Sequence, residues 1–158
     1  MRILLVEDDE IKRRRIVELV TSAVPTAEIR EARSRQSGMR ALSDGTWALV
    51  ILDMSMPVYD IAGDEDGGST LPYGGRDLLR QMERRKIDAP VVVVTQFDTF
   101  GEGSDEMSLD EVNSDLKERH GASYLGAIYY HPAYDSWRDD LRRVVEAVVR
   151  NTRPVPEQ

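Results

Sequence analysis

Three apolar runs in this chain each end in side chains that could take part in chemistry. The polar residues that directly follow these runs are Glu7, Asp8 and Asp9, then Asp53, and then Thr95. Uninterrupted runs of leucine, isoleucine and valine are typical of strands buried on both faces, as in a parallel sheet covered by helices. Ligands bind beyond the carboxyl ends of the strands in such sheets. We therefore expect these acids and the hydroxyl to form a functional site at one edge of a sheet.

Clustered carboxylates without neighbouring bases favour a bound cation. Acids held close together repel one another, and some would be driven neutral unless a cation compensates their charge. Oxygen ligands suit a hard ion, and Mg²⁺ is typically held by carboxylates, with waters and phosphate completing its shell. A carboxylate at such a site can also be a nucleophile that forms an aspartyl-phosphate, with a hydroxyl binding the phosphoryl oxygens. The residues therefore predict phosphoryl chemistry that depends on Mg²⁺.

Helices must connect these strands. A helix after the first strand carries apolar side chains at helical spacing from Ile16 to Val24, and residues 137–149 form a continuous apolar stripe in the last helix. Further segments read as the helices 34–42, 76–86 and 108–120 and as the weaker strands 27–32 and 124–130. Strand and helix thus alternate five times. This pattern predicts an α/β fold of three layers, with a five-stranded parallel sheet and helices on both faces.

Length and composition narrow the class of protein. The 158 residues suit a single domain, expected over residues 1–151 with insertions at about 58–74 and 96–107 and a tail at 152–158. A net charge of −8 argues against a nucleic-acid partner. The sequence has neither a membrane-spanning stretch nor a signal peptide, so we expect a cytoplasmic protein without a membrane partner. The absence of cysteine excludes a thiolate metal site and a cysteine nucleophile.

The motifs resemble the receiver domain of two-component response regulators. The resemblance rests on Val6-Glu7-Asp8-Asp9, on Asp53-Met54-Ser55-Met56-Pro57 and on Thr95, in this order at the strand ends, and it spans residues 2–150. It implies the flavodoxin-like fold of that family. It also implies phosphorylation by a histidine kinase or phosphotransfer protein, and a signal delivered by contact to an unknown downstream protein. On this reading the chain is not an enzyme.

The resemblance assigns a role to each acid. Asp53 would be the phospho-acceptor, Asp8 a direct Mg²⁺ ligand, and Glu7 a ligand acting through water. The backbone carbonyl of Ser55 would complete the protein ligands. Asp9 is a fallback ligand, because three adjacent acids leave the register open by one position.

Around the phosphoryl group the chain both follows and departs from the family. Thr95 would hydrogen-bond the phosphoryl group, and Gly75 matches the glycine that begins the family's third helix. The family's fifth strand ends in Lys-Pro, the lysine contacting the phosphoryl oxygen, but here His131-Pro132 stands at that place. A histidine donor is shorter and mostly neutral at pH 7. The bulky Gln96 follows Thr95, where the family has a small residue.

These departures leave more than one function open. The leading hypothesis is a stand-alone receiver that accepts a phosphoryl group on Asp53 and lacks an output domain. The alternative is a pseudo-receiver, an interaction module of the same fold that works without phosphorylation, which His131, Gln96 and the insertions favour. A phosphohydrolase of the haloacid-dehalogenase kind is disfavoured, because Ser55 stands where that family needs a second aspartate. The sequence also leaves a homodimer open.

Overall fold

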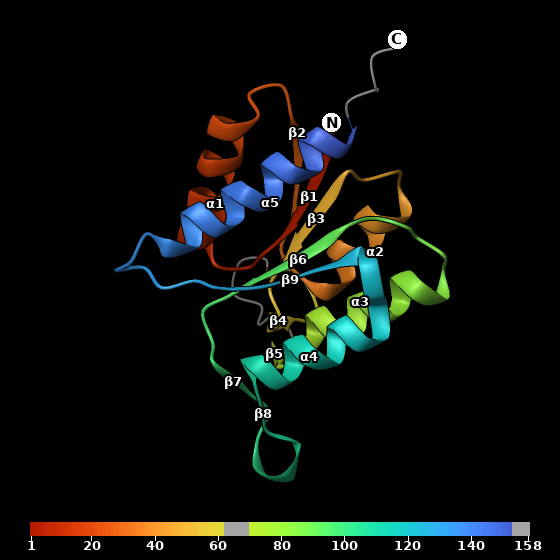
Figure 1. Ribbon diagram of the computed structural model, residues 1–158. Helices are drawn as coiled ribbons and strands as arrows, with labels where there is room; N and C mark the ends of the chain where they lie inside the picture. Colours follow the sequence, from red (N-terminus) through yellow and green to blue (C-terminus); the bar gives the residue numbers. More distant parts are fainter. Residues whose placement is uncertain (62–69, 153–158) are drawn as a thin grey trace.

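A five-stranded parallel sheet forms the centre of the computed structural model, which describes residues 1–61 and 70–152 (Figure 1). The strands lie in the order β2-β1-β3-β6-β9. Their bounds are β1 Arg2–Val6, β2 Glu28–Ala32, β3 Leu49–Leu52, β6 Val91–Thr95 and β9 Tyr124–Tyr129. All neighbouring strands of this sheet pair in parallel. The predicted fold class is therefore confirmed.

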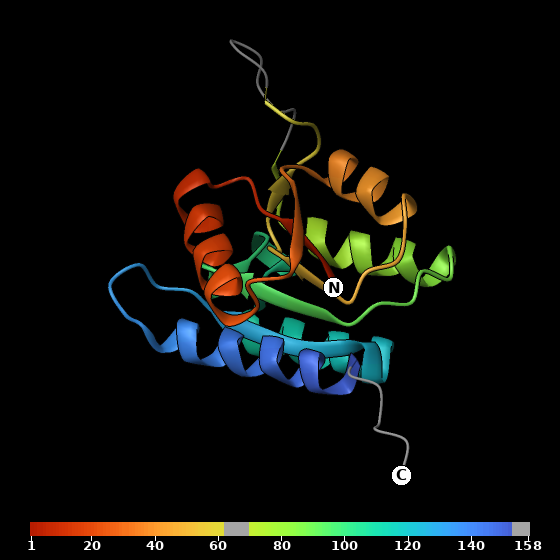
Figure 2. The ribbon, with the colours of Figure 1, turned by 90° about the horizontal axis from the view of Figure 1, so that it is seen from above.

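Helices cover both faces of the sheet and make the second and third layers (Figure 2). One face carries α1 (Glu10–Ala23) and α5 (Ser136–Thr152). The other carries α2 (Arg35–Ser43), α3 (Gly74–Arg84) and α4 (Leu109–His120). No helix within the described residues has the length and hydrophobicity needed to cross a membrane.

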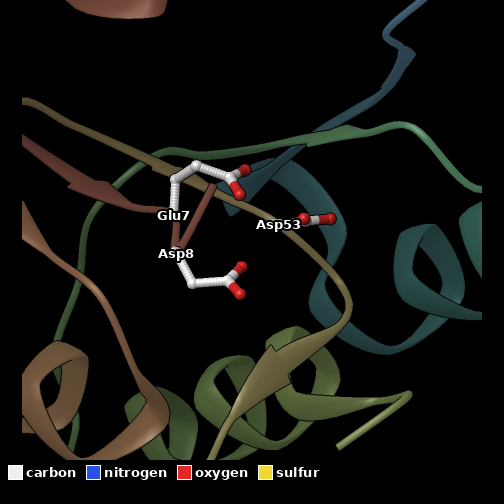
Figure 3. A group of neighbouring side chains, drawn as sticks. All are labelled: Glu7, Asp8 and Asp53. Carbon is white, nitrogen blue, oxygen red and sulfur yellow. The ribbon is translucent and has the colours of Figure 1, made fainter. Parts of the chain in front are cut away.

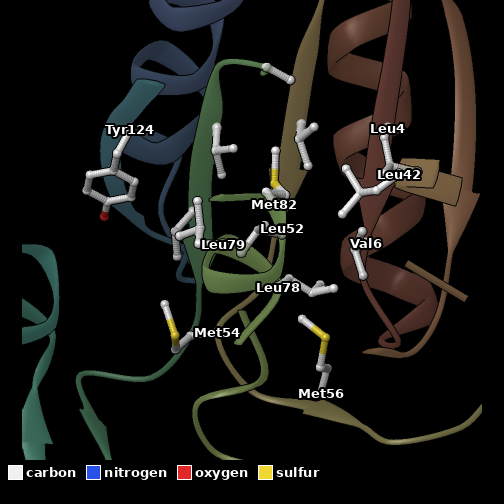
Figure 4. Packing of buried hydrophobic residues seen from close by; sticks show 14 of the residues in the cluster. Leu4, Val6, Leu42, Leu52, Met54, Met56, Leu78, Leu79, Met82 and Tyr124 are labelled. Atoms are coloured by element: carbon white, nitrogen blue, oxygen red, sulfur yellow. The ribbon is translucent and has the colours of Figure 1, made fainter. Parts of the chain in front are cut away.

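The alternation of side chains along the strands divides the core into two clusters. On β1, Leu4 and Val6 face α2 and α3, and the intervening Leu5 faces α1 and α5. Figure 4 shows Leu4 and Val6 converging with Leu78 of α3 and other residues of the first cluster. Because both faces are covered, these strand residues are almost fully buried, which explains their continuous hydrophobic sequence.

A short antiparallel pair is found at each insertion, where long loops were expected. In the first, β4 (Met56–Pro57) pairs with β5 (Thr70–Leu71). In the second, β7 (Thr99–Phe100) pairs with β8 (Met107–Ser108), and this hairpin projects away from the sheet (Figure 1). The acidic middle of the first insertion, residues 62–69, lies outside the described residues, as does the predicted tail after residue 152.

Candidate functional site

Three carboxylates meet at the carboxyl edge of the sheet. Glu7 and Asp8 follow β1, and Asp53 follows β3, which pairs with β1 in parallel. The register of this pair sets the two strand ends side by side. One carboxylate oxygen from each acid lies within 4.8 Å of the others, and Figure 3 shows the Glu7 and Asp8 side chains extending toward Asp53. The structure therefore brings together three of the acids that the sequence singled out.

The three acids differ in exposure. Glu7 and Asp53 are only 2% and 3% exposed, whereas Asp8 is exposed to solvent. Both oxygens of Asp53 are engaged: Oδ1 accepts a hydrogen bond from the Met54 backbone N–H at 2.7 Å, and Oδ2 forms an ion pair. The Asp53 carboxylate is thus held in one orientation.

The partner in that ion pair is Lys12 of α1, which the sequence pattern did not single out. Its Nζ lies 3.1 Å from Asp53 Oδ2 and 2.6 Å from Glu7 Oε2, and it donates to the Val94 carbonyl at 2.7 Å. The expectation of an acid cluster without bases is therefore wrong. A buried ammonium compensates part of the charge that the carboxylates bring together.

A signal for Lys12 was present in the sequence. Lys12 lies four residues before Ile16 and eight before Val20, which places it on the apolar stripe of α1. A charged residue on a buried stripe needs a partner, because burial of an unpaired charge is very costly. The acids that pair with Lys12 lie at the ends of β1 and β3, outside α1. The sequence of α1 therefore predicts a buried ion pair but does not identify the acid.

Burial raises the pKa of two of these acids, Glu7 and Asp8. Burial raises the pKa of Glu7 to about 8, against the attraction of Lys12 and with the help of the negative charge of Asp53. Burial likewise raises the pKa of Asp8. For Lys12, burial acts to lower the pKa, but the charges of Asp53 and Glu7 outweigh it and raise the pKa. Three carboxylates and one ammonium leave an excess of negative charge.

The donor set fits a hard divalent cation. Carboxylate oxygens from Glu7, Asp8 and Asp53 are close enough together to share one ion, and their uncompensated charge favours it. Asp9 is placed differently: its carboxylate accepts the Lys12 backbone N–H at 2.8 Å and caps α1. The fallback ligand therefore serves the helix and lies outside the three-acid cluster. The Ser55 hydroxyl donates to the Pro72 carbonyl at 3.2 Å, and the role of the Ser55 backbone carbonyl stays a prediction.

Thr95 and His131 lie at the ends of the next two strands. Thr95 is fully buried at the end of β6, and its Oγ1 accepts a hydrogen bond from the Phe97 N–H at 3.3 Å. His131 follows β9; its Nδ1 accepts the Ala133 N–H at 3.1 Å, and its ring centroid lies 4.8 Å from that of Tyr134. These contacts hold His131 within its own loop. The cation that touches Asp53 comes from α1.

Gly75 is fixed by the backbone of the acceptor loop. Its N–H donates to the Met54 carbonyl at 2.9 Å. A Cβ at this position would lie 2.5 Å from the Asp53 carbonyl oxygen and 2.7 Å from Leu52 Cδ1. Only glycine permits this close approach of α3 to the loop that carries Asp53.

Together, the parallel strand order β2-β1-β3-β6-β9 and the acids after β1 and β3 define a receiver domain. Comparison with known proteins agrees with this class. No model of a known protein family matches the sequence. The chain is 30% identical over 145 residues to the uncharacterised protein y4jR of Sinorhizobium fredii, covering 90% of this chain and 95% of y4jR. It is 26% identical over 141 residues to the Detocs response regulatory protein DtcB of Enterobacter cloacae, covering 87% and 94% of the two chains.

Solved structures share the fold at lower identity. A two-component response regulator from Clostridium difficile superposes with a TM-score of 0.63 at 15% identity, covering 98% of this chain and 99% of that chain. The response regulator TrrA from Thermotoga maritima, solved in complex with Mg²⁺-BeF, gives a TM-score of 0.57 at 18% identity, covering 93% and 97%. The chain belongs to one family with y4jR, and it is an atypical response-regulator receiver domain.

Proposed function

We propose that this protein is a phospho-accepting receiver that signals by protein–protein contact and is not itself an enzyme. Asp53 would take a phosphoryl group from a histidine kinase or phosphotransfer protein. The observation that carries the proposal is the position of Asp53: it directly follows β3, is oriented through both oxygens, and shares an edge with Glu7 and Asp8. A nucleophile held in this way needs little reorganisation before it reacts.

The transfer is a displacement at phosphorus. A carboxylate oxygen of Asp53 forms the new phosphorus–oxygen bond as the bond to the donor breaks, and the donor leaves with that electron pair. Bound Mg²⁺, held by Glu7, Asp8 and Asp53, would neutralise charge on the transferring group. Thr95, at the end of the adjacent strand, would donate its hydroxyl to a phosphoryl oxygen.

The partners are proposed to be proteins. A phosphodonor protein would act before this chain and an unknown downstream protein after it, and a homodimer is compatible with both. The net charge of −8 disfavours nucleic acid. A location in the cytoplasm suits a protein that meets the phosphodonor domain of a kinase.

The pseudo-receiver alternative draws support from Lys12. Its ammonium binds Glu7 and Asp53, so the acids are partly compensated without any metal. A module that never meets Mg²⁺ could therefore keep these carboxylates at a lower cost than an uncompensated cluster would impose.

Phosphorylation by a small donor separates the two functions. The protein is incubated with Mg²⁺ and acetyl phosphate, and its intact mass is followed. A phosphoryl adduct that requires Mg²⁺ and is lost in Asp53→Asn supports the receiver. Asp9→Asn is the matched control: it changes a neighbouring acid to the same amide, yet asparagine retains the helix cap, so its adduct should persist.

The opposite result contradicts the receiver. If neither acetyl phosphate nor phosphorylated histidine kinases yield an adduct, and Mg²⁺ does not bind, the pseudo-receiver is the better function. An adduct that survives in Asp53→Asn would place the acceptor elsewhere.

A further inference from the structure

Lys12 stands out among the described residues as a buried lysine that the proposed chemistry leaves without a role. Its side chain is 2% exposed, although it begins on the first turn of α1. An ammonium has three N–H donors. Here they have three acceptors on three different strands or strand ends: Glu7 after β1, Asp53 after β3, and Val94 within β6.

Burying Lys12 together with its acids has a free-energy cost that apolar packing at the same positions would not have. A buried ion-pair cluster is often no more stable than well-packed apolar residues at all of its positions, although removal of one partner alone is destabilising. Lys12 occupies the apolar stripe of α1, where a leucine or methionine would pack beside the Tyr130 ring, 5.7 Å from Nζ. Stability of the fold by itself therefore does not explain why Lys12 and its two acids are buried together here.

The chemistry at Asp53 does call for a cation. A phosphoryl group on a carboxylate brings additional negative charge to an edge that already holds Glu7 and Asp8. A fixed positive group beside the acceptor oxygen stabilises the charge that develops during transfer. Lys12 lies at hydrogen-bonding distance from one of the two oxygens that could carry the phosphoryl group.

The expected alternative source of that cation is engaged elsewhere. His131 accepts a hydrogen bond at Nδ1 from the Ala133 N–H and packs against Tyr134. One of its two ring nitrogens is thus used within its own loop. The ammonium at the site belongs to Lys12.

We infer that Lys12 is the cationic residue of this site that contacts the phosphoryl group, so that the positive charge comes from α1 instead of from the residue before Pro132. The inference rests on the proposed function. It identifies the Lys12 ammonium as the cation that replaces the lysine at the end of the family's fifth strand. Lys12 exchanges its bond to Asp53 Oδ2 for one to a phosphoryl oxygen, while its stem stays on α1. Before phosphorylation the same ammonium competes with Mg²⁺ for Glu7 and Asp53.

Contact with the phosphoryl group and competition with Mg²⁺ predict opposite effects of Lys12→Met on phosphorylation and on Mg²⁺ binding. Phosphorylation by acetyl phosphate should slow by at least about tenfold, since loss of one preorganised donor commonly costs more than that. Binding of Mg²⁺ alone should strengthen severalfold, because a competing cation is gone. Binding of beryllium fluoride with Mg²⁺, followed by ¹⁹F NMR, should weaken, which reports on the phosphoryl contact without any turnover.

Arg13→Met is the matched control. Arg13 is the next residue of α1 and is also buried, at 6% exposure, but its guanidinium binds the Glu7 carbonyl and the Glu31 carboxylate. The Arg13→Met substitution removes a buried cation from the same helix and leaves the contacts of the Asp53 carboxylate in place. Arg13 also donates to the Asp8 carbonyl at 3.4 Å, so its loss acts on the backbone of the acids. It should not produce the combination expected for Lys12→Met, slower phosphorylation together with tighter Mg²⁺ binding. Should Lys12→Met fail to fold, Lys12→Gln removes the charge and keeps a polar side chain of similar length.

A rescue variant tests whether the position of the cation matters. Lys12→Met combined with His131→Lys supplies an ammonium from the end of β9, and the phosphorylation rate should recover at least in part. A wild type that is phosphorylated, with Lys12→Met phosphorylated equally fast, overturns the inference and leaves the proposed function standing. A wild type that takes up no phosphoryl group from any donor overturns both.

Discussion

At the scale of single residues, the position of Asp53 is set by contacts with its side chain and with its backbone. Met54 and Lys12 orient the two carboxylate oxygens, while Gly75 of α3 packs against the Asp53 carbonyl. The acceptor therefore depends on one residue that has no side chain and on one that has a long charged side chain. Substitution of either Gly75 or Lys12 should therefore disturb Asp53.

Gly75→Ala should destabilise the fold and disturb Asp53. The added methyl meets backbone, which cannot move aside as a flexible side chain can, so we expect a loss of about 1–3 kcal/mol in the free energy of unfolding. Urea denaturation measures it. Gly38→Ala in α2 is the control: its Cβ meets side-chain atoms at 3.1–3.4 Å, and alanine's better helix propensity offsets that contact. Equal effects of the two substitutions would argue against the close approach at Gly75.

Binding of Mg²⁺ should strengthen as the pH rises toward about 8. Burial raises the pKa of Glu7 to about 8, so below that pH the carboxyl holds a proton that a metal must displace. At low pH the Glu7 carboxyl is protonated. As the pH rises it loses this proton, and the carboxylate becomes free to bind the metal. Calorimetric titrations at pH 6, 7 and 8 measure the trend. An affinity that is constant over this range would mean that Lys12 keeps Glu7 ionised throughout.

At the scale of elements, the tyrosine that precedes α3 contacts the second insertion. The Tyr73 hydroxyl lies 2.9 Å from the Phe100 carbonyl and 2.6 Å from the Asp105 carbonyl, and it can donate to either. Phe100 of β7 is buried, so the hairpin has an apolar anchor as well as a polar one. The hairpin is thus an ordered part of the face beside Thr95.

Tyr73→Phe should loosen the β7–β8 hairpin without unfolding the domain. Removing the hydroxyl costs about 1 kcal/mol of hydrogen bonding and leaves the ring packing intact. Amide hydrogen exchange over residues 99–108 should become faster, while the central strands keep their protection. Tyr134→Phe, which removes a hydroxyl from a side chain that is 65% exposed, is the control and should leave this exchange unchanged. Unchanged exchange in Tyr73→Phe would mean that the Tyr73 hydroxyl does not hold the hairpin.

At the scale of the whole molecule, the acid cluster joins the ends of β1 and β3, two central strands of the sheet. A ligand held by both strand ends binds the folded chain far better than the unfolded one. Any such ligand therefore stabilises the fold as a unit. The site and the stability of the domain are consequently linked.

Addition of Mg²⁺ should raise the free energy of unfolding, by about 2.7 kcal/mol when the ion is at 100 times its dissociation constant. Removal of the ion with EDTA should reverse the gain, as followed by chemical denaturation. Asp8→Asn should lose most of it at little cost to the metal-free fold, because Asp8 is exposed. A gain in Asp8→Asn equal to that of the wild type would place the ion away from this cluster.

The sequence by itself determined the sheet and the kind of residues at its edge. Runs such as Val91–Val94 specify doubly buried strands locally, and the residue after each run must then lie at the carboxyl edge. For this reason the fold class and the grouping of Glu7, Asp8 and Asp53 could be predicted from the order of residues alone. These conclusions depend only on short stretches of chain and on the geometry that all parallel sheets share.

Only the tertiary structure decided how the acids are used. It assigned Asp9 to the cap of α1, engaged His131 in its own loop, and brought Lys12 against Asp53 and Val94. The contacts of Lys12 join segments that are far apart in the chain. They depend on how α1 packs against the ends of β3 and β6, which no local pattern encodes. The hydrophobic spacing of α1 fixes which face is buried, but the acid that a buried lysine meets is set by the assembled sheet.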